Sequence, residues 1–290
     1  MNEITKSLIL TPFNLLYKIS PKFELQMLFR LKTKRKLNFD NPKSFNEKLN
    51  YLKLYDTKIA NELKPVLCDK YRVREYVEKL AGRQILNELY WEGFDPKDIP
   101  YDKLPNQFVI KVTHGSTFNI IVKDKNTLNR NKVEKKLHTW LKAKFIPCYG
   151  EWWYGKVRPR IIIEKYLENH DKGELIDYKV FCFHGVPKLI DVHAGRFGNH
   201  TRNLYDVKWN FYKDARIKYP QGEVMSKPNQ LKELLKYAEI LSKDFKHVRI
   251  DFFMVDEKIY FGEFTFANGA GFDAITPYEF DLEMGSWLNV

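Results

Sequence analysis

One stretch near the C-terminus, His247 to Phe272, constrains the fold more than any other part of the chain. Its sequence is HVRIDFFMVDEKIYFGEFTFANGAGF. Two apolar runs, Val248 to Val255 and Lys258 to Phe264, flank the pair Asp256 and Glu257. This pattern predicts two largely buried strands joined by a tight turn. We therefore expect an antiparallel hairpin around which the rest of the chain is organised.

Each strand of this hairpin carries a carboxylate where an apolar residue would pack better. Asp251 and Glu263 would face each other on neighbouring strands, and their repulsion requires a cation or a proton between them. Such hard oxygen ligands suit Mg²⁺, and Mg²⁺ suits nucleotide phosphates. The alternative is that each acid pairs with Arg249 or with a lysine at the sheet edge. The Gly-rich turn at 268–271 favours the metal hypothesis for the pair.

Composition limits the class of protein. A chain of 290 residues with 44% hydrophobic content can bury a substantial core. The 49 Lys and Arg against 37 Asp and Glu give a formal charge of +12, which favours an anionic partner such as a nucleotide, an acidic glycan, nucleic acid or a membrane face. Cys68, Cys148 and Cys182 lie far apart, so neither a disulfide framework nor a zinc site is indicated. A reducing cytoplasm fits this cysteine usage.

The N-terminal segment leaves two interpretations open. No stretch approaches the ~20 apolar residues that cross a bilayer, and no secretory signal pattern is present. Residues Ser7 to Phe29 are nevertheless apolar-rich and lead into a basic cluster at 30–36. They could form an interfacial helix whose cations meet anionic lipid headgroups at the inner face of the membrane. They could equally pack on the body of the protein.

A strand, a small polar loop and a returning strand are predicted in the middle of the chain. Phe108 to Val112 and Asn119 to Val122 are the strands, and the loop between them contains Gly115 and Ser116. Backbone N–H groups and hydroxyls of such a loop can bind phosphoryl oxygens, and Lys111 can neutralise them. An ordinary hairpin is the alternative, and the loop lacks the G-K-[ST] pattern of a Walker motif.

A second polar loop, Gly195 to Asn203, is dense in hydrogen-bond donors and lies between two apolar strands. Arginine forks match phosphate or carboxylate geometry, so the loop is typical of an anion clamp. We expect Arg196 and Asn199 to bind substrate there, and Arg202 and His200 to take part in catalysis. The sequence does not decide which of them touches nucleotide and which touches an acceptor carboxylate.

Helices are signalled between these motifs. Ser44 with Glu47 forms a capping box before a helix that ends near Tyr55. Further helices are predicted to open at Asp69, at a cap formed by Asn131, and at Asn229.

Four runs give the chain a family resemblance: LPNQFVIKVTHGSTFNIIVKDK, PRIIIEKYLE, DYKVFCFHGVPKLIDVHAGRFGNHTRNLYD and VRIDFFMVDEKIYFGEFTFANGAGF. They resemble the TupA-like ATP-grasp proteins of bacterial surface-polysaccharide gene clusters, from about Leu31 onward. The resemblance implies an α+β ATP-grasp fold in which two lobes with antiparallel sheets clasp ATP. The implied divisions are an N-terminal helical segment at 1–65, a small lobe at 66–164 and a large lobe at 165–290.

The resemblance also implies roles for individual residues. Asp251 and Glu263, with Asn268, would hold Mg²⁺. One departure concerns Thr265, which stands where many ATP-grasp proteins have an Asn two residues after the metal-binding Glu. Phosphate would be bound by Lys70, Lys111, Gly115, Ser116 and Lys179, the adenine by Glu164, Lys165, Tyr166 and Leu167, and the ribose by Asp177.

These expectations lead to one preferred function and two alternatives. The preferred function is an ATP-dependent carboxylate–amine ligase that forms an acyl phosphate, with Arg249 stabilising charge and without a general base from the protein. Its acceptor would be an anionic glycan of a capsule or other surface polysaccharide, or a sugar-linked carboxylate, and its donor an amine or amino acid. A glycosyltransferase is the first alternative, although no Asp-x-Asp motif is present. A binder of nucleic acid or membrane without catalysis would not explain two carboxylates in buried strands, and we expect no nucleic-acid partner.

Overall fold

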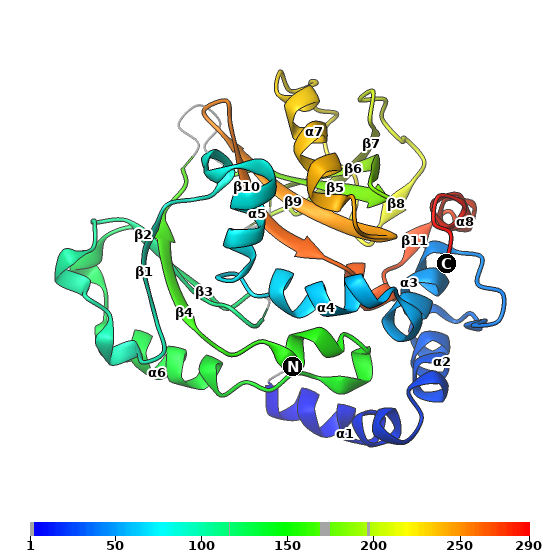
Figure 1. Ribbon diagram of the computed structural model, residues 1–290, viewed down its shortest axis with the longest axis horizontal. Helices are drawn as coiled ribbons and strands as arrows, with labels where there is room; N and C mark the ends of the chain where they lie inside the picture. The colour runs from blue at the N-terminus through cyan, green and yellow to red at the C-terminus, as the bar shows by residue number, and fades with distance from the viewer. Residues whose placement is uncertain (1–2, 116, 169–174, 196–197) are drawn as a thin grey trace.

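The computed structural model describes residues 3–115, 117–168, 175–195 and 198–290, with side chains from Leu10 onward. Two antiparallel sheets and eight α-helices make up the described part of the chain, which confirms the predicted α+β class (Figure 1). The four-stranded sheet has the order β1-β4-β2-β3, with strands Leu89–Gly93, Ile161–Lys165, Phe108–Val112 and Asn119–Val122. The five-stranded sheet has the order β10-β9-β5-β6-β7, with strands Lys258–Thr265, His247–Val255, Asp177–Phe183, Val186–Ala194 and Thr201–Asp206. A short ladder joins β11 (Ile275–Thr276) to β8 (Arg216–Ile217).

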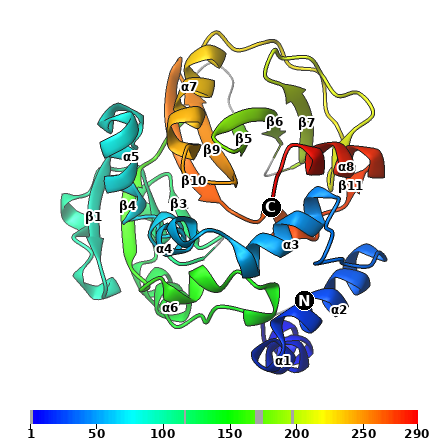
Figure 2. The same ribbon diagram turned by 45° about the vertical axis from the view of Figure 1, so that its right-hand side comes forward.

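The helices surround these sheets. Their bounds are α1 Glu3–Ile19, α2 Pro21–Thr33, α3 Phe45–Tyr55, α4 Lys58–Leu67, α5 Val73–Ala81, α6 Arg130–Leu141, α7 Leu231–Ser242 and α8 Tyr278–Ser286. Helix α6 packs on the four-stranded sheet, while α7 packs on the five-stranded one. Figure 2 shows α1 and α2 at one edge of the molecule, next to α3. Within the described residues every helix is too short or too polar to span a bilayer.

The two faces of the five-stranded sheet differ in chemistry. Because side chains alternate along a strand, Tyr178, Val180 and Cys182 of β5 point to the apolar face that α7 covers. Phe181 and Phe183 point to the other face, where they pack against α3 and α8. Asp177 and Lys179 continue this second face toward the opposite end of the strand, where charged residues replace apolar ones. The sheet therefore holds a charged region on a buried scaffold.

The expected C-terminal hairpin is present. Asp256 and Glu257 occupy left-handed backbone conformations, with φ of 47° and 63°, and they join β9 to β10 in a two-residue turn. A β-bulge between Phe261 and Glu263 shifts the register by one residue, so that Glu263 lies opposite Asp251. The predicted pairing of the two carboxylates across the hairpin is confirmed.

Three expected helix starts were wrong. The helix predicted to open at Asn229 begins at Leu231. The helix predicted to open at Asp69 begins at Val73, because the Asp69 carboxylate accepts the backbone N–H of Tyr71 and holds a turn there. The cap of α6 is Asn129 and not Asn131, since the Asn129 side chain accepts the backbone N–H of Lys132 at 2.9 Å.

Candidate active site

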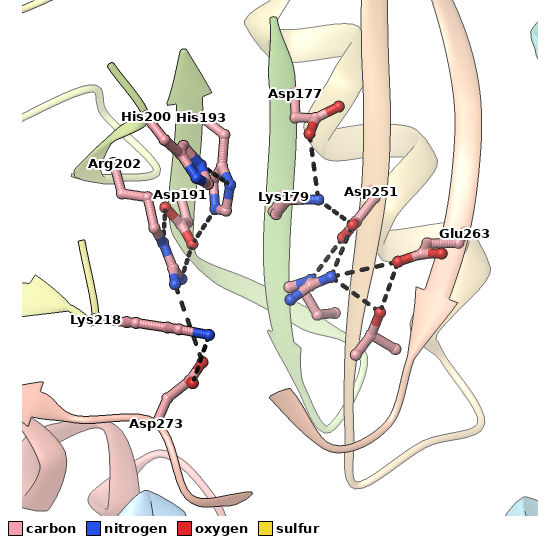
Figure 3. A network of polar contacts seen from close by, with 12 residues as sticks. Asp177, Lys179, Asp191, His193, His200, Arg202, Lys218, Asp251, Glu263 and Asp273 are labelled. Carbon is pink, nitrogen blue, oxygen red and sulfur yellow. Dashed lines mark hydrogen bonds and ion pairs between the residues drawn. The ribbon is translucent and has the colours of Figure 1, made fainter. Parts of the chain in front are cut away.

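Two polar clusters lie side by side on the charged region of the five-stranded sheet (Figure 3). The first, the Arg249 cluster, comprises Asp177, Lys179, Arg249, Asp251, Glu263 and Thr265. Arg249 donates from Nε and Nη2 to the two carboxylate oxygens of Asp251 at 2.6 and 2.7 Å, and Lys179 donates to the same carboxylate. Burial would raise the pKa of Asp251, but Arg249 and Lys179 lower it to about 2. Asp251 is therefore ionised at neutral pH.

Glu263 forms the open side of this cluster. Its side chain is 47% exposed, and its Oε1 lies 3.6 Å from Arg249 Nη2. Thr265 accepts a hydrogen bond from Arg249 Nη2 at 3.0 Å, and its hydroxyl donates to Glu263 Oε1 at 3.4 Å. Arg249 thus stands between the two acids, which is the ion pairing that the sequence left open as an alternative. Its guanidinium offsets their repulsion and leaves Glu263 accessible.

The donor set of this cluster fits Mg²⁺ in chemistry. No group of three His, Cys, Asp or Glu side chains suited to a metal is gathered within the described ranges. In nucleotide sites, however, Mg²⁺ takes one or two carboxylates and completes its shell with phosphate oxygens and water. Asp251 and Glu263 supply two such carboxylates, paired across β9 and β10.

Asn268 adds an observation of its own. It lies in η7 (Asn268–Gly271), separated from the end of β10 by two residues, and its side chain is buried with neither amide atom hydrogen-bonded. A buried amide without a partner costs stability, so it marks a position where a ligand atom would be favourable. The side-chain oxygen of Asn268 is therefore a candidate third ligand for the metal near this end of the hairpin.

Helix α3 holds the η7 loop in place. Three donors at positions i, i+4 and i+7 of α3 each bind a backbone carbonyl of the segment after Asn268. They are Asn46 to Asp273 at 3.0 Å, Asn50 to Gly271 at 2.9 Å and Lys53 to Ala270 at 2.6 Å. The predicted capping box of Ser44 and Glu47 fixes the start of this helix. The sequence analysis missed these positioning residues, although their helical spacing of buried polar groups was a signal.

The second cluster, the Asp191 cluster, comprises Asp191, His193, His200 and Arg202. Arg202 donates to both oxygens of Asp191, with Nε at 3.2 Å from Oδ1, and His193 Nε2 lies 3.0 Å from Oδ2. His200 Nε2 lies 3.1 Å from His193 Nδ1, which completes a chain from carboxylate to two imidazoles. Arg202 also reaches Asp273 at 4.0 Å. Sequence reasoning found Arg202 and His200 but missed Asp191 and His193, which look like ordinary strand residues.

Burial governs the protonation of this second cluster. Burial would raise the pKa of Asp191, but Arg202 and His193 hold it well below its usual range. Burial lowers the pKa of His193 to about 4, against the favourable field of Asp191. At neutral pH the hydrogen-bond chain from Asp191 to the two histidines therefore begins with an ionised carboxylate beside a neutral imidazole. Of the other residues expected here, Asn199 is exposed, whereas Arg196 lies outside the described residues.

Strand β2 and the segment at the start of α5 supply further cations, Lys111, Lys70 and Arg74. Lys70 donates to the backbone carbonyl of Gly115 at 2.7 Å, and burial lowers its pKa. Lys111 donates to Glu164 at 2.6 Å, and Arg74 donates to the other oxygen of Glu164 at 2.9 Å. Glu164 thus bridges two cations, an arrangement in which Arg74 was not anticipated. Ser116 lies outside the described ranges.

A small pocket connects the two sheets. Lys70 and Gly115 line it from one side, and Glu263 lines it from the other. The predicted phosphate loop, the lysine before α5 and the exposed acid of the Arg249 cluster are therefore brought together, although they are separated widely in sequence. Residues from the β2–β3 loop and from β10 line this pocket, and Glu263 links it to the Arg249 cluster.

A larger cleft of about 540 Å³ lies beside the end of β4. Lys165, which was expected to bind the adenine, lines it together with Arg74 and Asn87, and Tyr260 lines it from β10. Asn87 donates to the Lys165 carbonyl at 2.9 Å. Half-buried Phe253 lies opposite Asp177 and Tyr260 on the charged face, so an apolar ring is available near the cleft. Tyr166 and Leu167 follow directly after the strand.

A family model described as TupA-like ATPgrasp matches residues 47–289. Among solved structures, the D-alanine–D-alanine ligase of Bacillus anthracis complexed with ATP is 20% identical, covers 69% of this chain and 53% of that chain, and has a TM-score of 0.38. The D-alanine–D-alanine ligase of Helicobacter pylori is 16% identical, with 85% and 70% coverage and a TM-score of 0.43. The L-amino acid ligase of Bacillus licheniformis is 14% identical, with 78% and 49% coverage and a TM-score of 0.46.

At these identities the likeness concerns the fold alone. This chain spans only about half the length of the Bacillus anthracis ligase, 53% of it. No curated protein matches the sequence. The family match confirms the assignment to an ATP-grasp fold that the sequence motifs predicted.

Proposed function

Because the chain belongs to the TupA-like ATP-grasp family, we propose that it is an ATP-dependent ligase that joins a carboxylate to an amine. One observation carries the proposal. Glu263 of the Arg249 cluster lines the same small pocket as Lys70 and Gly115, so a carboxylate suited to a metal and a cation suited to phosphates lie at one place. Phosphoryl transfer depends mainly on such positioning and charge stabilisation.

The nucleotide would lie along the interface of the two sheets. In this proposal Lys70, Lys111 and the Gly115 loop would bind its phosphates, and the cleft beside Lys165 would take the base near Phe253. Asp177 and Lys179 lie between these two ends, on β5. Mg²⁺ bound with the nucleotide would be held by Asp251, Glu263 and Asn268 and would reduce the negative charge of the phosphates.

The proposed reaction has two transfers. An acceptor carboxylate oxygen attacks the γ-phosphorus of ATP, the bond to the bridging oxygen breaks, and ADP leaves. The amine nitrogen then attacks the carbonyl carbon of the acyl phosphate, and inorganic phosphate leaves as the amide forms. Arg249 and Lys179 are placed to stabilise the charge that develops on the transferred oxygens.

The incoming amine must lose its protons, and the Asp191 cluster offers a route for one of them. His200 ends the chain that begins at buried Asp191, and a neutral imidazole coupled to a carboxylate is a suitable proton acceptor. This revises the expectation that no protein base takes part. We place His200 as the acceptor of the ammonium proton, with His193 and Asp191 as positioning residues.

The acceptor we propose is an acidic surface polysaccharide or its precursor, and the donor an amino acid or related amine. The basic loop that contains Asn199 adjoins the Asp191 cluster, and the formal charge of +12 favours an anionic acceptor. We place the reaction in the cytoplasm, where ATP is available.

The test is ADP release that depends on an acceptor carboxylate. Purified protein is given Mg²⁺, ATP, a uronic-acid oligosaccharide and an amino acid, and ADP, phosphate and amide are measured together. We expect all three products in equal amounts, and none of the amide when the carboxylate is reduced to an alcohol. ADP release that ignores the acceptor, or sugar transfer from a nucleotide sugar without ATP, would contradict the ligase assignment.

A further inference from the structure

The corner between α1 and α2 exposes apolar side chains that the rest of the molecule does not cover. Leu15 and Ile19 of α1 are 57% and 81% exposed, and Phe23 and Leu31 of α2 are 57% and 51% exposed. Leu15 and Ile19 are four residues apart and so lie on one side of α1, and Phe23 follows in the first turn of α2, just after Ser20. Exposed apolar groups in such a row mark an interaction surface.

The same corner is strongly basic. Residues 10–39 contain one acid and the seven cations Lys18, Lys22, Arg30, Lys32, Lys34, Arg35 and Lys36. Lys18, Arg30, Lys34 and Lys36 make no salt bridge within the part of the chain that the structure describes. The one acid, Glu24, is buried, and burial raises its pKa to about 8, so that it is mostly neutral at pH 7. The outward charge of the corner is therefore positive.

The inner side of the helix pair is already packed. Leu25, Leu28 and Phe29 form a buried cluster with Phe272, and the rings of Phe29 and Phe272 lie 6.3 Å apart. Packing on the body of the protein, one of the two interpretations from the sequence, thus accounts for this inner side. It does not account for Ile19 or Phe23, which point away from the cluster. Since the inner side anchors the helices, the outer side is presented as a fixed surface.

We propose that the α1–α2 corner binds the surface of a bilayer that contains anionic lipids. Aliphatic and aromatic side chains can enter the boundary between headgroups and acyl chains, while the flanking lysines and arginines meet the phosphates. A second copy of the chain would instead bring two cationic surfaces together. A nucleic acid would satisfy the cations but would offer no apolar environment for Ile19. This inference does not depend on the ligase reaction.

The experiment is co-sedimentation of the full-length protein with vesicles. One set contains phosphatidylcholine alone, and the other equal parts of phosphatidylcholine and phosphatidylglycerol. We expect binding to the mixed vesicles only, with about a tenfold loss of affinity or more in the variant Lys34→Gln/Lys36→Gln, because each cation near the surface contributes separately. Added salt should weaken the binding by screening.

Two matched variants separate the contribution of the apolar side chains to vesicle binding from the effect of adding negative charge anywhere on the surface. Ile19→Glu/Phe23→Glu should abolish sedimentation, whereas Val224→Glu, at a side chain that is 64% exposed elsewhere, should leave it unchanged. ATP affinity should be equal in all variants, which shows that each remains folded. Equal binding to both kinds of vesicle, no binding at all, or full binding by Ile19→Glu/Phe23→Glu would overturn the proposal. A concentration-dependent dimer that these substitutions dissociate would assign the corner to self-association instead.

Discussion

The Arg249 and Asp191 clusters are both built around a buried aspartate that pairs with an arginine, but they differ in their access to ligands. Each places one buried aspartate between two nitrogen-bearing groups, Asp251 between Arg249 and Lys179, and Asp191 between Arg202 and His193. In the Arg249 cluster a further acid, Glu263, reaches the pocket between the lobes. Both aspartates are buried with both carboxylate oxygens occupied, but Asp191 is the one acid among the four residues of its cluster.

The difference shows that a buried ion pair needs all of its polar atoms paired within the protein, whereas a ligand site needs polar atoms that are still free to bind. Removing one partner of a fully paired buried charge leaves the other uncompensated, so such a residue is needed mainly for stability. A half-exposed acid loses little on neutralisation, and it is free to bind a ligand. We therefore expect substitutions in the two clusters to affect different measurements.

The largest expected effect is on folding, in Asp191→Asn. This change removes the buried counter-charge of the Arg202 guanidinium and leaves it only Asp273 at 4.0 Å, so we expect a loss of about 3 kcal/mol in the free energy of unfolding. Asp251→Asn should cost less, because Glu263 remains within 3.6 Å of Arg249. Urea denaturation of both variants measures the difference. Equal losses would remove the distinction that we draw between the clusters.

Glu263→Gln should instead reduce turnover strongly and change stability little. We expect turnover to fall by about a hundredfold, because a ligand beside the phosphates is lost, while the free energy of unfolding changes by less than about 0.5 kcal/mol. Glu257→Gln, at the exposed turn of the same hairpin, is the matched control and should be fully active. Normal turnover in Glu263→Gln would rule out Glu263 as a metal ligand.

Lys111, a cation outside both clusters, tests how much one contact contributes to nucleotide binding. Lys111→Ala should weaken ATP binding by about 1 to 3 kcal/mol, the range of a charge-assisted hydrogen bond in a partly buried site. Lys97→Ala, an exposed lysine on the same lobe, should leave the affinity unchanged. Calorimetric titration with a non-hydrolysable ATP analogue makes the comparison. An unaltered affinity in Lys111→Ala would argue against the phosphate loop.

A further expected effect concerns pH. Because the pKa of His193 falls from 6.5 to about 4 on folding, the unfolded chain binds the proton more readily. The free energy of unfolding should therefore decrease as pH falls from 6.5 toward 4, with a contribution approaching about 1.4 kcal/mol per pH unit. His193→Gln should remove this contribution. Buried His247, with a pKa lowered to about 3, lies outside both clusters and should still contribute in that variant.

Local sequence patterns determined much of this protein. The pair Asp256 and Glu257 between two apolar runs indicated the hairpin, and Ser44 with Glu47 indicated the start of α3. Periodicity and capping depend on neighbouring residues, so they can be read without knowing the fold. The family motifs added the ATP-grasp architecture.

Tertiary structure decided the contacts that make the site. Counting outward from the two-residue turn would pair Asp251 with Gly262 and place Glu263 on the opposite face, but the β-bulge restores the facing carboxylates. A Cβ atom at position 262 would come within 2.9 Å of the Asp251 carbonyl oxygen, which explains why glycine occupies this position. Likewise Asp191 and His193 acquire their roles only because β6 lies beside β7, which brings Arg202 to them. Strand register and the packing of distant segments depend on the whole chain, and no local pattern encodes them.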